Sequence, residues 1–303
     1  MVVQFQEDGI CVAFVKRMPP GSPSVDRVVY YPHGPLAAKL SLDKLAKDLN
    51  GASYHCSNLL SAREYQLLSV EAPNVPAEEL KTAIRWRLKD MLDYHIDDAT
   101  IDVLDVPGDK DSPVRSHSMY AVAARNQLIE QRQTQFEEAR IPLSVIDIPE
   151  MAQRNISAML EPATRGVALL SFDASGGLLT VTYSGELYLA RRIDVTLAQL
   201  QQDESEQKDS CYDRVTLELQ RTFDHLDRQY RFITLSKLVL FPVGDAGKGL
   251  QTYLAANLYV PVEILDLGNL FDISRVPDLK RLESQQRYFL ALGAALREEE
   301  VAL

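Results

Sequence analysis

Residues 166–183 of the chain read GVALLSFDASGGLLTVTY. Two apolar runs flank a short polar turn, so this stretch predicts a strand, a tight turn and a second strand. Asp173 ends the first run, and Ser175, Gly176 and Gly177 follow in the turn. Such a turn can present backbone N–H groups to a phosphate while an aspartate holds a metal ion or a water molecule. A plain hairpin turn capped by Asp173 is the simpler interpretation, and we favour it on the residues alone.

Strand and helix patterns alternate on both sides of this hairpin, which predicts an α/β protein. Each half opens with a hairpin pattern, at residues 2–16 and 166–183, and we interpret this as a weak internal repeat. The best domain boundary is at residues 162–166, where a proline, small polar residues and a glycine separate two regular regions. We therefore predict one domain over residues 1–163 and a second over 164–303.

Hydrophobic periodicity and turn residues place the other elements. Further strands are predicted at residues 25–31, 64–72, 99–106, 119–124, 143–148, 186–194, 237–241 and 262–265. Helices are predicted at residues 41–49, 76–93, 126–140, 149–160, 212–230, 250–258 and 284–299. Residues 199–210 are interpreted as a flexible linker or a frayed helix start. The helix at 76–93 has an apolar stripe made of Leu80, Ala83, Ile84, Leu88, Met91 and Leu92.

Composition limits the function. The 303 residues include 32 Lys and Arg against 43 Asp and Glu, which gives a net charge of −11. An acidic surface disfavours nucleic acid, and no basic cluster predicts membrane-surface binding. The cysteines at 11, 56 and 211 are far apart, as expected of thiols in a reducing compartment. No secretory signal and no apolar run of about 20 residues is present, so we expect a cytoplasmic protein.

Common catalytic motifs are missing. Gly247 and Lys248 resemble part of a phosphate-binding P-loop, but Pro242 stands where the motif needs glycine and Gly249 where it needs serine or threonine. No histidine pair has helical metal-ligand spacing, and no G-x-S-x-G segment is present. We assign no catalytic residue and no metal site.

Several stretches together resemble the PilM-like family of type IV pilus assembly proteins, in particular those of the mannose-sensitive haemagglutinin (MSHA) pilus. The resemblance covers nearly the whole chain. The most specific stretches are AIRWRLKD at 83–90 and IDVLDVP at 101–107, joined by FDAS at 172–175, SGEL at 184–187, ELQRTFD at 218–224, residues 250–266 and ALGAALR at 291–297.

The resemblance implies an actin-like, ribonuclease H-like fold of two α/β domains, with an α+β insertion in the first domain at about residues 59–145. It also implies a cytoplasmic location beneath the inner membrane. Proteins of this family hold the N-terminal cytoplasmic tail of a single-pass inner-membrane partner, which is PilN-like, or MshJ-like in the MSHA system. Self-association stays open.

Actin-like proteins bind ATP through two Asp-x-Gly hairpins and a glycine-rich loop. The resemblance maps these parts onto Asp8 with the later Lys16, onto the Asp173 turn, and onto residues 241–247 with Gly244. Two glycines are lost, and glycine is what lets the backbone approach a phosphate. Glu218 would contact a ribose or simply be an exposed helix acid, which we favour slightly.

Two functional hypotheses follow. The first is a non-catalytic scaffold with a degenerate nucleotide cleft and no cofactor; the second is an ATP- and magnesium-binding, slow ATPase whose nucleotide state gates partner binding. Asp147 and Glu150 would position water in the second case and cap a helix in the first. A weaker third hypothesis is a type II secretion relative, which we disfavour because such proteins continue into a membrane span.

The resemblance does not identify the residues that would bind the partner, so we infer them from residue chemistry. Arg85, Trp86 and Arg87 combine an aromatic anchor with two cations, as interface centres do. A single tryptophan at helical spacing is more often part of the core, with the arginines solvated, and that alternative stays open. A partner peptide would otherwise add as a strand to an exposed sheet edge.

Overall fold

The structure is a computed structural model, and it describes residues 1–16, 21–32, 38–51, 54–108, 118–202, 205–244 and 246–297. The chain forms two compact units. The first consists of residues 1, 3–10 and 30–148, and the second of residues 2, 11–29 and 149–303. The strands belong to three sheets, two with five strands and one with three.

The first five-stranded sheet has the order β3-β2-β1-β4-β8. Its strands are β1 (Val2–Gln6), β2 (Gly9–Lys16), β3 (Ser24–Pro32), β4 (Cys56–Leu59) and β8 (Leu143–Asp147). Helices α1 (Ala38–Leu49) and α3 (Asn126–Glu138) contact each other, and α3 contacts β8. Helix α1 begins three residues before the predicted cap at Ser41, which is therefore wrong, because residues 38–40 are good helix formers that extend the helix.

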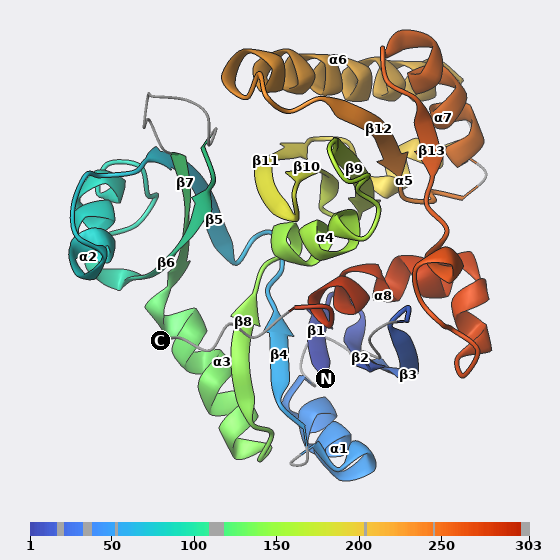
Figure 1. The fold of residues 1–303 in the computed structure, drawn as a ribbon. Coiled ribbons are helices and arrows are strands. Elements are labelled where there is room, and N and C mark those ends of the chain that lie inside the picture. The colour runs from blue at the N-terminus through green and yellow to red at the C-terminus, as the bar shows by residue number, and fades with distance from the viewer. Residues whose placement is uncertain are drawn as a thin grey trace. The chain divides into compact units, whose positions relative to one another are not determined.

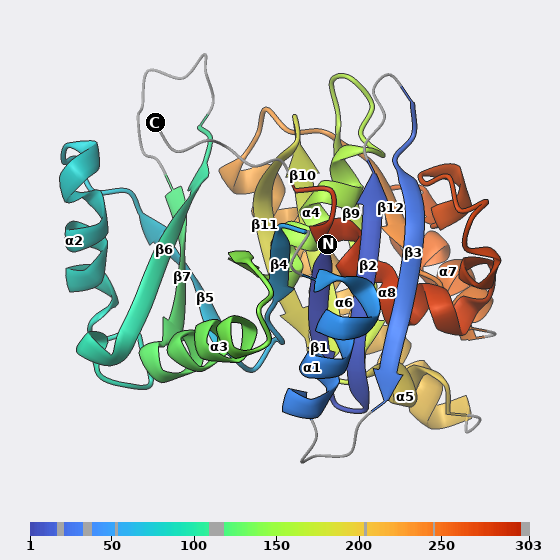
Figure 2. The ribbon, with the colours of Figure 1, turned by 90° about the horizontal axis from the view of Figure 1, so that it is seen from below.

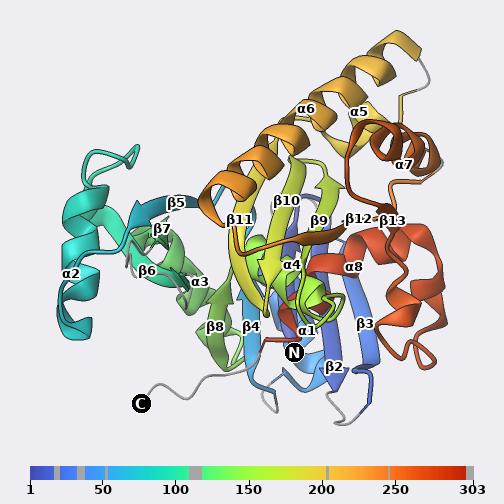
Figure 3. The ribbon, with the colours of Figure 1, turned by 45° about the horizontal axis from the view of Figure 1, so that its top comes forward.

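The second five-stranded sheet has the order β11-β10-β9-β12-β13 (Figure 3). Its strands are β9 (Gly166–Asp173), β10 (Gly176–Tyr183), β11 (Glu186–Ile193), β12 (Leu235–Leu240) and β13 (Val262–Ile264). Strand β10 is antiparallel to β9 and β11, whereas β12 is parallel to β9 and β13. Both large sheets place their strands in the order third, second, first, fourth, fifth, which confirms the predicted repeat of an opening hairpin.

The second unit contains the helices that pack on this sheet, together with α8 (Leu282–Ala294), which packs on α4 (Pro149–Ala158). Besides α4, the helices on the sheet are α5 (Leu197–Leu200), α6 (Ser205–Gln229) and α7 (Ala246–Asn257). Figure 3 shows α6 running obliquely from beside β11 toward α5 and α7. The linker interpretation of residues 199–210 is wrong, because Thr196 and Gln199 form a capping box that starts α5, and α6 already begins at Ser205. The end predicted for the last helix, residue 299, lies outside the described residues.

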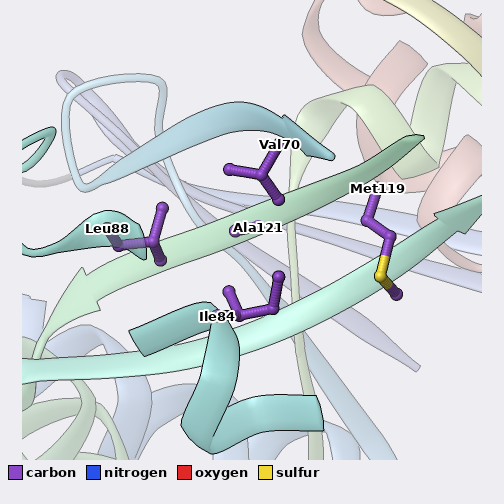
Figure 4. Close-up of a cluster of buried hydrophobic side chains, with 5 residues drawn as sticks. All are labelled: Val70, Ile84, Leu88, Met119 and Ala121. Carbon is purple, nitrogen blue, oxygen red and sulfur yellow. The ribbon is translucent and has the colours of Figure 1, made fainter. Parts of the chain in front are cut away.

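The three-stranded sheet has the order β5-β7-β6 and is antiparallel throughout. Its strands are β5 (Tyr65–Glu71), β6 (Ala99–Val106) and β7 (Ser118–Arg125), and α2 (Ala77–Leu88) lies against them (Figures 1 and 2). Figure 4 shows the small core that joins helix and sheet, formed by Val70, Ile84, Leu88, Met119 and Ala121. This sheet lies within the stretch expected as an insertion; the domain boundaries themselves stay a prediction.

Short 3-10 helices complete the fold: η2 (Ile96–Asp98), η3 (Leu267–Asn269) and η4 (Pro277–Lys280). Cys11, Cys56 and Cys211 are buried thiols. Burial raises the pKa of the Cys56 thiol to about 12. Among the described helices, none has both the length and the apolar composition needed to cross a bilayer.

Candidate functional site

Helix α2 presents Trp86 to solvent. Pro76 precedes the helix, and the acidic Glu78 and Glu79 in its first turn suit the positive end of the helix dipole. Ile84 and Leu88 are one helical turn apart and fully buried against the sheet. Trp86 lies two residues from each, so it emerges on the opposite face and is 73% exposed. The interpretation of Trp86 as a core residue is therefore wrong.

The arginines on either side of Trp86 have partners within their own subdomain. Arg85 donates to the carbonyl oxygens of Ala99 and Ile96 at 3.0 and 2.9 Å. Arg87 donates to the carbonyl oxygen of Glu71 at 2.8 Å. The two guanidinium groups thus fasten α2 to the start of β6 and to the end of β5. They support the helix that presents Trp86. The alternative of solvated arginines is wrong for the half-buried Arg85, whereas Arg87 is hydrogen-bonded and still exposed.

The apolar stripe predicted for this helix runs too far. The helix ends at Leu88, and the following residues form turns. Met91 is consequently released from the buried face and is 45% exposed. Trp86 and Met91 are two large apolar side chains that this part of the chain leaves in water.

The Asp173 turn is closed by its own carboxylate. Oδ1 of Asp173 accepts hydrogen bonds from the Ser175 N–H at 2.7 Å, the Ser175 hydroxyl at 2.5 Å and the Gly176 N–H at 3.1 Å. Gly176 and Gly177 belong to β10, and the turn itself contains only Ala174 and Ser175. The backbone donors that a phosphate would need already have an acceptor.

The glycines after this turn are required by packing. Gly176 has a φ of +137°, and a Cβ atom there would lie 2.8 Å from the carbonyl oxygen of Ile193. A Cβ on Gly177 would lie 2.8 Å from the Phe172 ring. Both contacts are under normal van der Waals distance, so glycine is explained at both positions without a ligand.

The remaining residues proposed for nucleotide binding also have partners in the chain. Glu218 of α6 accepts hydrogen bonds from Arg191 and from Arg221, both at 2.9 Å, so it is not a bare helix acid. Lys16 forms an ion pair with Asp26 at 3.3 Å. The structure brings Asp173, Ser175 and Gly176 together in one turn and records no contact from them to Lys16 or Glu218 within the described residues.

The predicted phosphate hairpin and adenosine loop are built differently. The backbone oxygen of Asp8 accepts a hydrogen bond from the Tyr30 hydroxyl at 2.6 Å. Gly244 has a φ of +83°, and the nearest atoms to a Cβ there would belong to Gln201 and Leu282. Asp245 of this loop lies outside the described residues. The N–H groups of Ser175 and Gly176 do not fit a bound triphosphate while Asp173 holds them, whereas the Lys16 side chain is 61% exposed and keeps donors open.

The acidic residues of the crossover have structural partners. Oδ1 of Asp147 accepts the N–H of Ile148, the residue just before α4, at 2.9 Å. Glu150 is 2% exposed and accepts a hydrogen bond from Arg192 at 2.8 Å. Neither contact satisfies an N–H group of the first turn of α4, so capping stays a prediction, as does the positioning of water.

Sequence reasoning missed Gln153 of α4. Its buried amide donates to the carbonyl oxygens of Leu169 and Leu178 and to the Thr180 hydroxyl, at 2.7 to 3.1 Å. Its carbonyl oxygen accepts from Ser171 at 2.7 Å. This network joins α4 to the hairpin of residues 166–183. No signal in the sequence separates a glutamine of this kind from an exposed one.

Comparison with solved structures decides the fold. A chain of a solved structure described as a PilM-PilN type IV pilus biogenesis complex superposes with a TM-score of 0.72 over 97% of this chain and 96% of that chain, at 18% identity. A Bacteroides thetaiotaomicron protein described as having an actin-like ATPase fold and unknown function superposes with a TM-score of 0.52, over 90% and 91% of the two chains, at 9% identity. This chain has an actin-like ATPase fold. No protein-family model and no curated protein matches the sequence of this actin-like chain.

Proposed function

We propose that this actin-like chain is a scaffold of type IV pilus assembly that holds the cytoplasmic tail of a PilN-like inner-membrane protein. The supporting observation is the end-to-end similarity to a chain from a PilM-PilN complex, which extends over the three-stranded sheet as well as the two large ones. On the motifs at 83–90 and 101–107, we further propose an MSHA-type system, with this chain as the MshI-like component and an MshJ-like protein as the partner. The scaffold would be cytoplasmic and would reach the membrane through that partner.

The closed Asp173 turn favours a scaffold over an ATPase. Binding a triphosphate there would require the carboxylate to release the N–H groups of Ser175 and Gly176. It would then place two like charges, carboxylate and phosphate, at the same donors. Under the proposal, the work of the protein lies in its contacts with other proteins.

The outer face of α2, with the turns that follow it, is the proposed docking surface. Trp86 and Met91 are exposed apolar side chains, and Trp86 is held by a helix that Arg85 and Arg87 fix to the sheet. An aromatic ring on a rigid element is the usual centre of a binding interface, because little side-chain entropy is lost when it is covered.

The single tryptophan provides the test. A synthetic peptide of the N-terminal cytoplasmic tail of the PilN-like protein is titrated into the purified chain while Trp86 fluorescence is recorded. We expect a saturable blue shift, because the indole leaves water. By calorimetry, Trp86→Ala is expected to weaken binding by at least about 30-fold, which corresponds to the roughly 2 kcal/mol of an interface hot spot.

The matched control is Leu217→Ala on α6, which removes another exposed apolar side chain, 46% exposed, from the second unit. We expect it to bind the peptide like the unmodified protein. Equal binding by the Trp86 and Leu217 variants would move the docking surface away from α2. Absence of any saturable binding by the unmodified protein would contradict the scaffold function itself.

A further inference from the structure

A cavity of about 420 Å³ lies in the second unit, at one end of the strands of its sheet. It is lined by Arg165, Asp227, Arg231 and residues 233–235 and 259–261. Arg165 immediately precedes β9, residues 233–235 lead into β12, and residues 259–261 lead into β13. These three strands are parallel, so the cavity lies at their amino ends. The Asp173 turn is at the other end of β9, and the two sites are therefore distinct.

Two arginines supply the positive charge of this cavity. Arg165 is held in place by a hydrogen bond of 2.6 Å to the carbonyl oxygen of Leu235. Arg231 has neither an ion pair nor a hydrogen bond with any residue that the structure describes. A guanidinium group has five donors arranged in a planar fork that matches carboxylate and phosphate oxygens. Two such groups on separate segments can share the oxygens of one dianionic phosphate.

The lining holds one acidic residue, Asp227, against two arginines, so one net positive charge remains. The carboxylate of Asp227 accepts a hydrogen bond from the Tyr259 hydroxyl. Burial of that hydroxyl and the negative charge of Asp227 raise the pKa of Tyr259 to about 12, so the phenol stays protonated and remains a donor to the carboxylate. In a chain with a net charge of −11, this is a local site that favours an anion.

Tyr259 adds a fixed aromatic surface. Asp227 holds its hydroxyl, and the Phe223 ring meets it in an edge-to-face contact with centroids 5.9 Å apart and an interplanar angle of 71°. The residue nevertheless stays 65% exposed. A ring anchored at its hydroxyl and by one neighbour, yet open to solvent, is a preorganised platform for stacking. Buried Ile233 and Leu235 supply an apolar wall beside it.

We propose that this cavity binds a small phosphate ester carried on a flat ring, with Arg165 and Arg231 on the phosphate and Tyr259 on the ring. The volume is within the range of pockets for small ligands, and a few polar groups on an apolar wall are what such pockets contain. The site is independent of the proposed scaffold function and of the Asp173 turn.

Phenyl phosphate is the minimal probe, because it contains both features and nothing else. It is titrated calorimetrically into the full chain in the presence of a chelator, alongside inorganic phosphate and phenol as half-ligands. We expect saturable binding of phenyl phosphate that is at least about tenfold tighter than that of either half-ligand. Arg231→Ala is expected to weaken it at least about tenfold. Tyr259→Ala is expected to reduce the preference over inorganic phosphate to less than about twofold.

Arg228→Ala is the control, since Arg228 is an exposed arginine near the end of α6, three residues before Arg231 in the chain. It lies outside the cavity lining and donates to its own helix at the Asp224 carbonyl oxygen. It is expected to leave the affinity unchanged. Three results would overturn the site: no saturable binding up to about 10 mM, equal loss in the Arg228 and Arg231 variants, or loss in Asp173→Ala while Arg231→Ala binds normally.

Discussion

At the scale of single residues, Arg132 and Glu64 form a poorly exposed ion pair in the first unit. The two side chains are only 10% and 21% exposed. Arg132 also lies over the Phe5 ring, with its guanidinium carbon 4.3 Å from the ring centroid. Glu64 additionally accepts the Ser61 N–H at 2.8 Å. The pair thus joins β1, the start of β5 and α3 within one unit.

Removing one partner of this pair leaves the other charge shielded from water and without a counter-ion. Glu64→Ala is therefore expected to lower the free energy of unfolding by about 3 kcal/mol, measured by urea denaturation. Asp102→Ala provides the comparison, because the ion pair of Asp102 with Lys81 is 70% and 65% exposed. Exposed pairs contribute little, so we expect less than about 1 kcal/mol there. Equal effects would show that Arg132 is solvated in the folded state.

Asp26 gives the molecule a predictable response to acid. A hydrogen bond from Arg275 and, after it, contacts from Lys16 lower the pKa of Asp26 below its ordinary value. The carboxylate is therefore favoured by folding, and its contribution is present above the ordinary aspartate pKa of about 4. It is lost as the pH falls through the lower pKa of the folded state.

The variant Asp26→Asn makes that contribution measurable. We expect the unmodified protein to be more stable than the variant at pH 7, and the difference to shrink steadily below about pH 4. Urea denaturation at a series of pH values follows this difference. A gap that stayed constant down to about pH 2 would mean that hydrogen bonding alone, without charge, accounts for the contact.

At the scale of elements, the packing of α4 against α8 depends on a glycine. A Cβ atom on Gly293 of α8 would lie 2.2 Å from the carbonyl oxygen of Ala152 in α4. Alanine is the better helix former by about 1 kcal/mol, but backbone atoms cannot yield as a flexible side chain does. Gly293→Ala is thus expected to destabilise the protein by about 1 to 3 kcal/mol in thermal or urea unfolding.

The control for this substitution is Gly247→Ala in α7. Its new Cβ would meet only Val243, at 3.4 Å, which is ordinary contact. We expect no loss of stability there, because helix propensity is then the only change of note. A neutral Gly293→Ala would indicate that α4 and α8 move apart without cost.

Elements with long and regular patterns were predictable from sequence. The apolar run of residues 166–173 and the alternation of 99–106 predicted β9 and β6 with their exact ends. Strand β4 was missed, because it has only four residues and two of them, Ser57 and Asn58, are polar. Asn58 is tolerated in this buried strand because its amide donates to the carbonyl oxygen of Val3 at 3.0 Å. Val3 is far from Asn58 in the chain, so the sequence alone does not indicate this contact.

The candidate sites were predictable only in part, for the same reason. Favouring a capped hairpin at Asp173 was justified by local turn chemistry. Arg85 and Arg87 were named beside Trp86, yet their actual acceptors are carbonyl oxygens of β6, η2 and β5, which only the folded sheet brings near. The position of Trp86, two residues from both Ile84 and Leu88, indicates an exposed side chain. The residue type indicates the opposite, because a lone tryptophan in a helix is more often buried.

At the scale of the whole molecule, the fold and the proposed function lead to opposite expectations about nucleotide binding. The fold is that of actin-like ATPases, whereas the N–H groups of Ser175 and Gly176 in the Asp173 turn of this chain already have an acceptor. Calorimetric titration with Mg-ATP is expected to show no saturable binding below about 1 mM, equivalent to roughly −4 kcal/mol or weaker. A thermal-shift scan should likewise show no stabilisation.

Micromolar binding of Mg-ATP would contradict this expectation. It would mean that the Asp173 turn opens, and it would make nucleotide-gated docking the leading mechanism. The variant Asp173→Ala would then decide whether the turn is the site: loss of binding would assign the nucleotide to it.

The buried thiols have a practical consequence for studying this molecule in solution. Cys11, Cys56 and Cys211 are all buried in the folded state, and a buried thiol reacts with a maleimide far more slowly than an exposed one. A cysteine introduced at the exposed position of Leu217 would therefore carry a dye alone, without deleting any native cysteine. Trp86, the only tryptophan, is a natural energy-transfer donor to that dye. The separation of α2 and α6 thereby becomes a quantity that can be followed in real time as a partner is added.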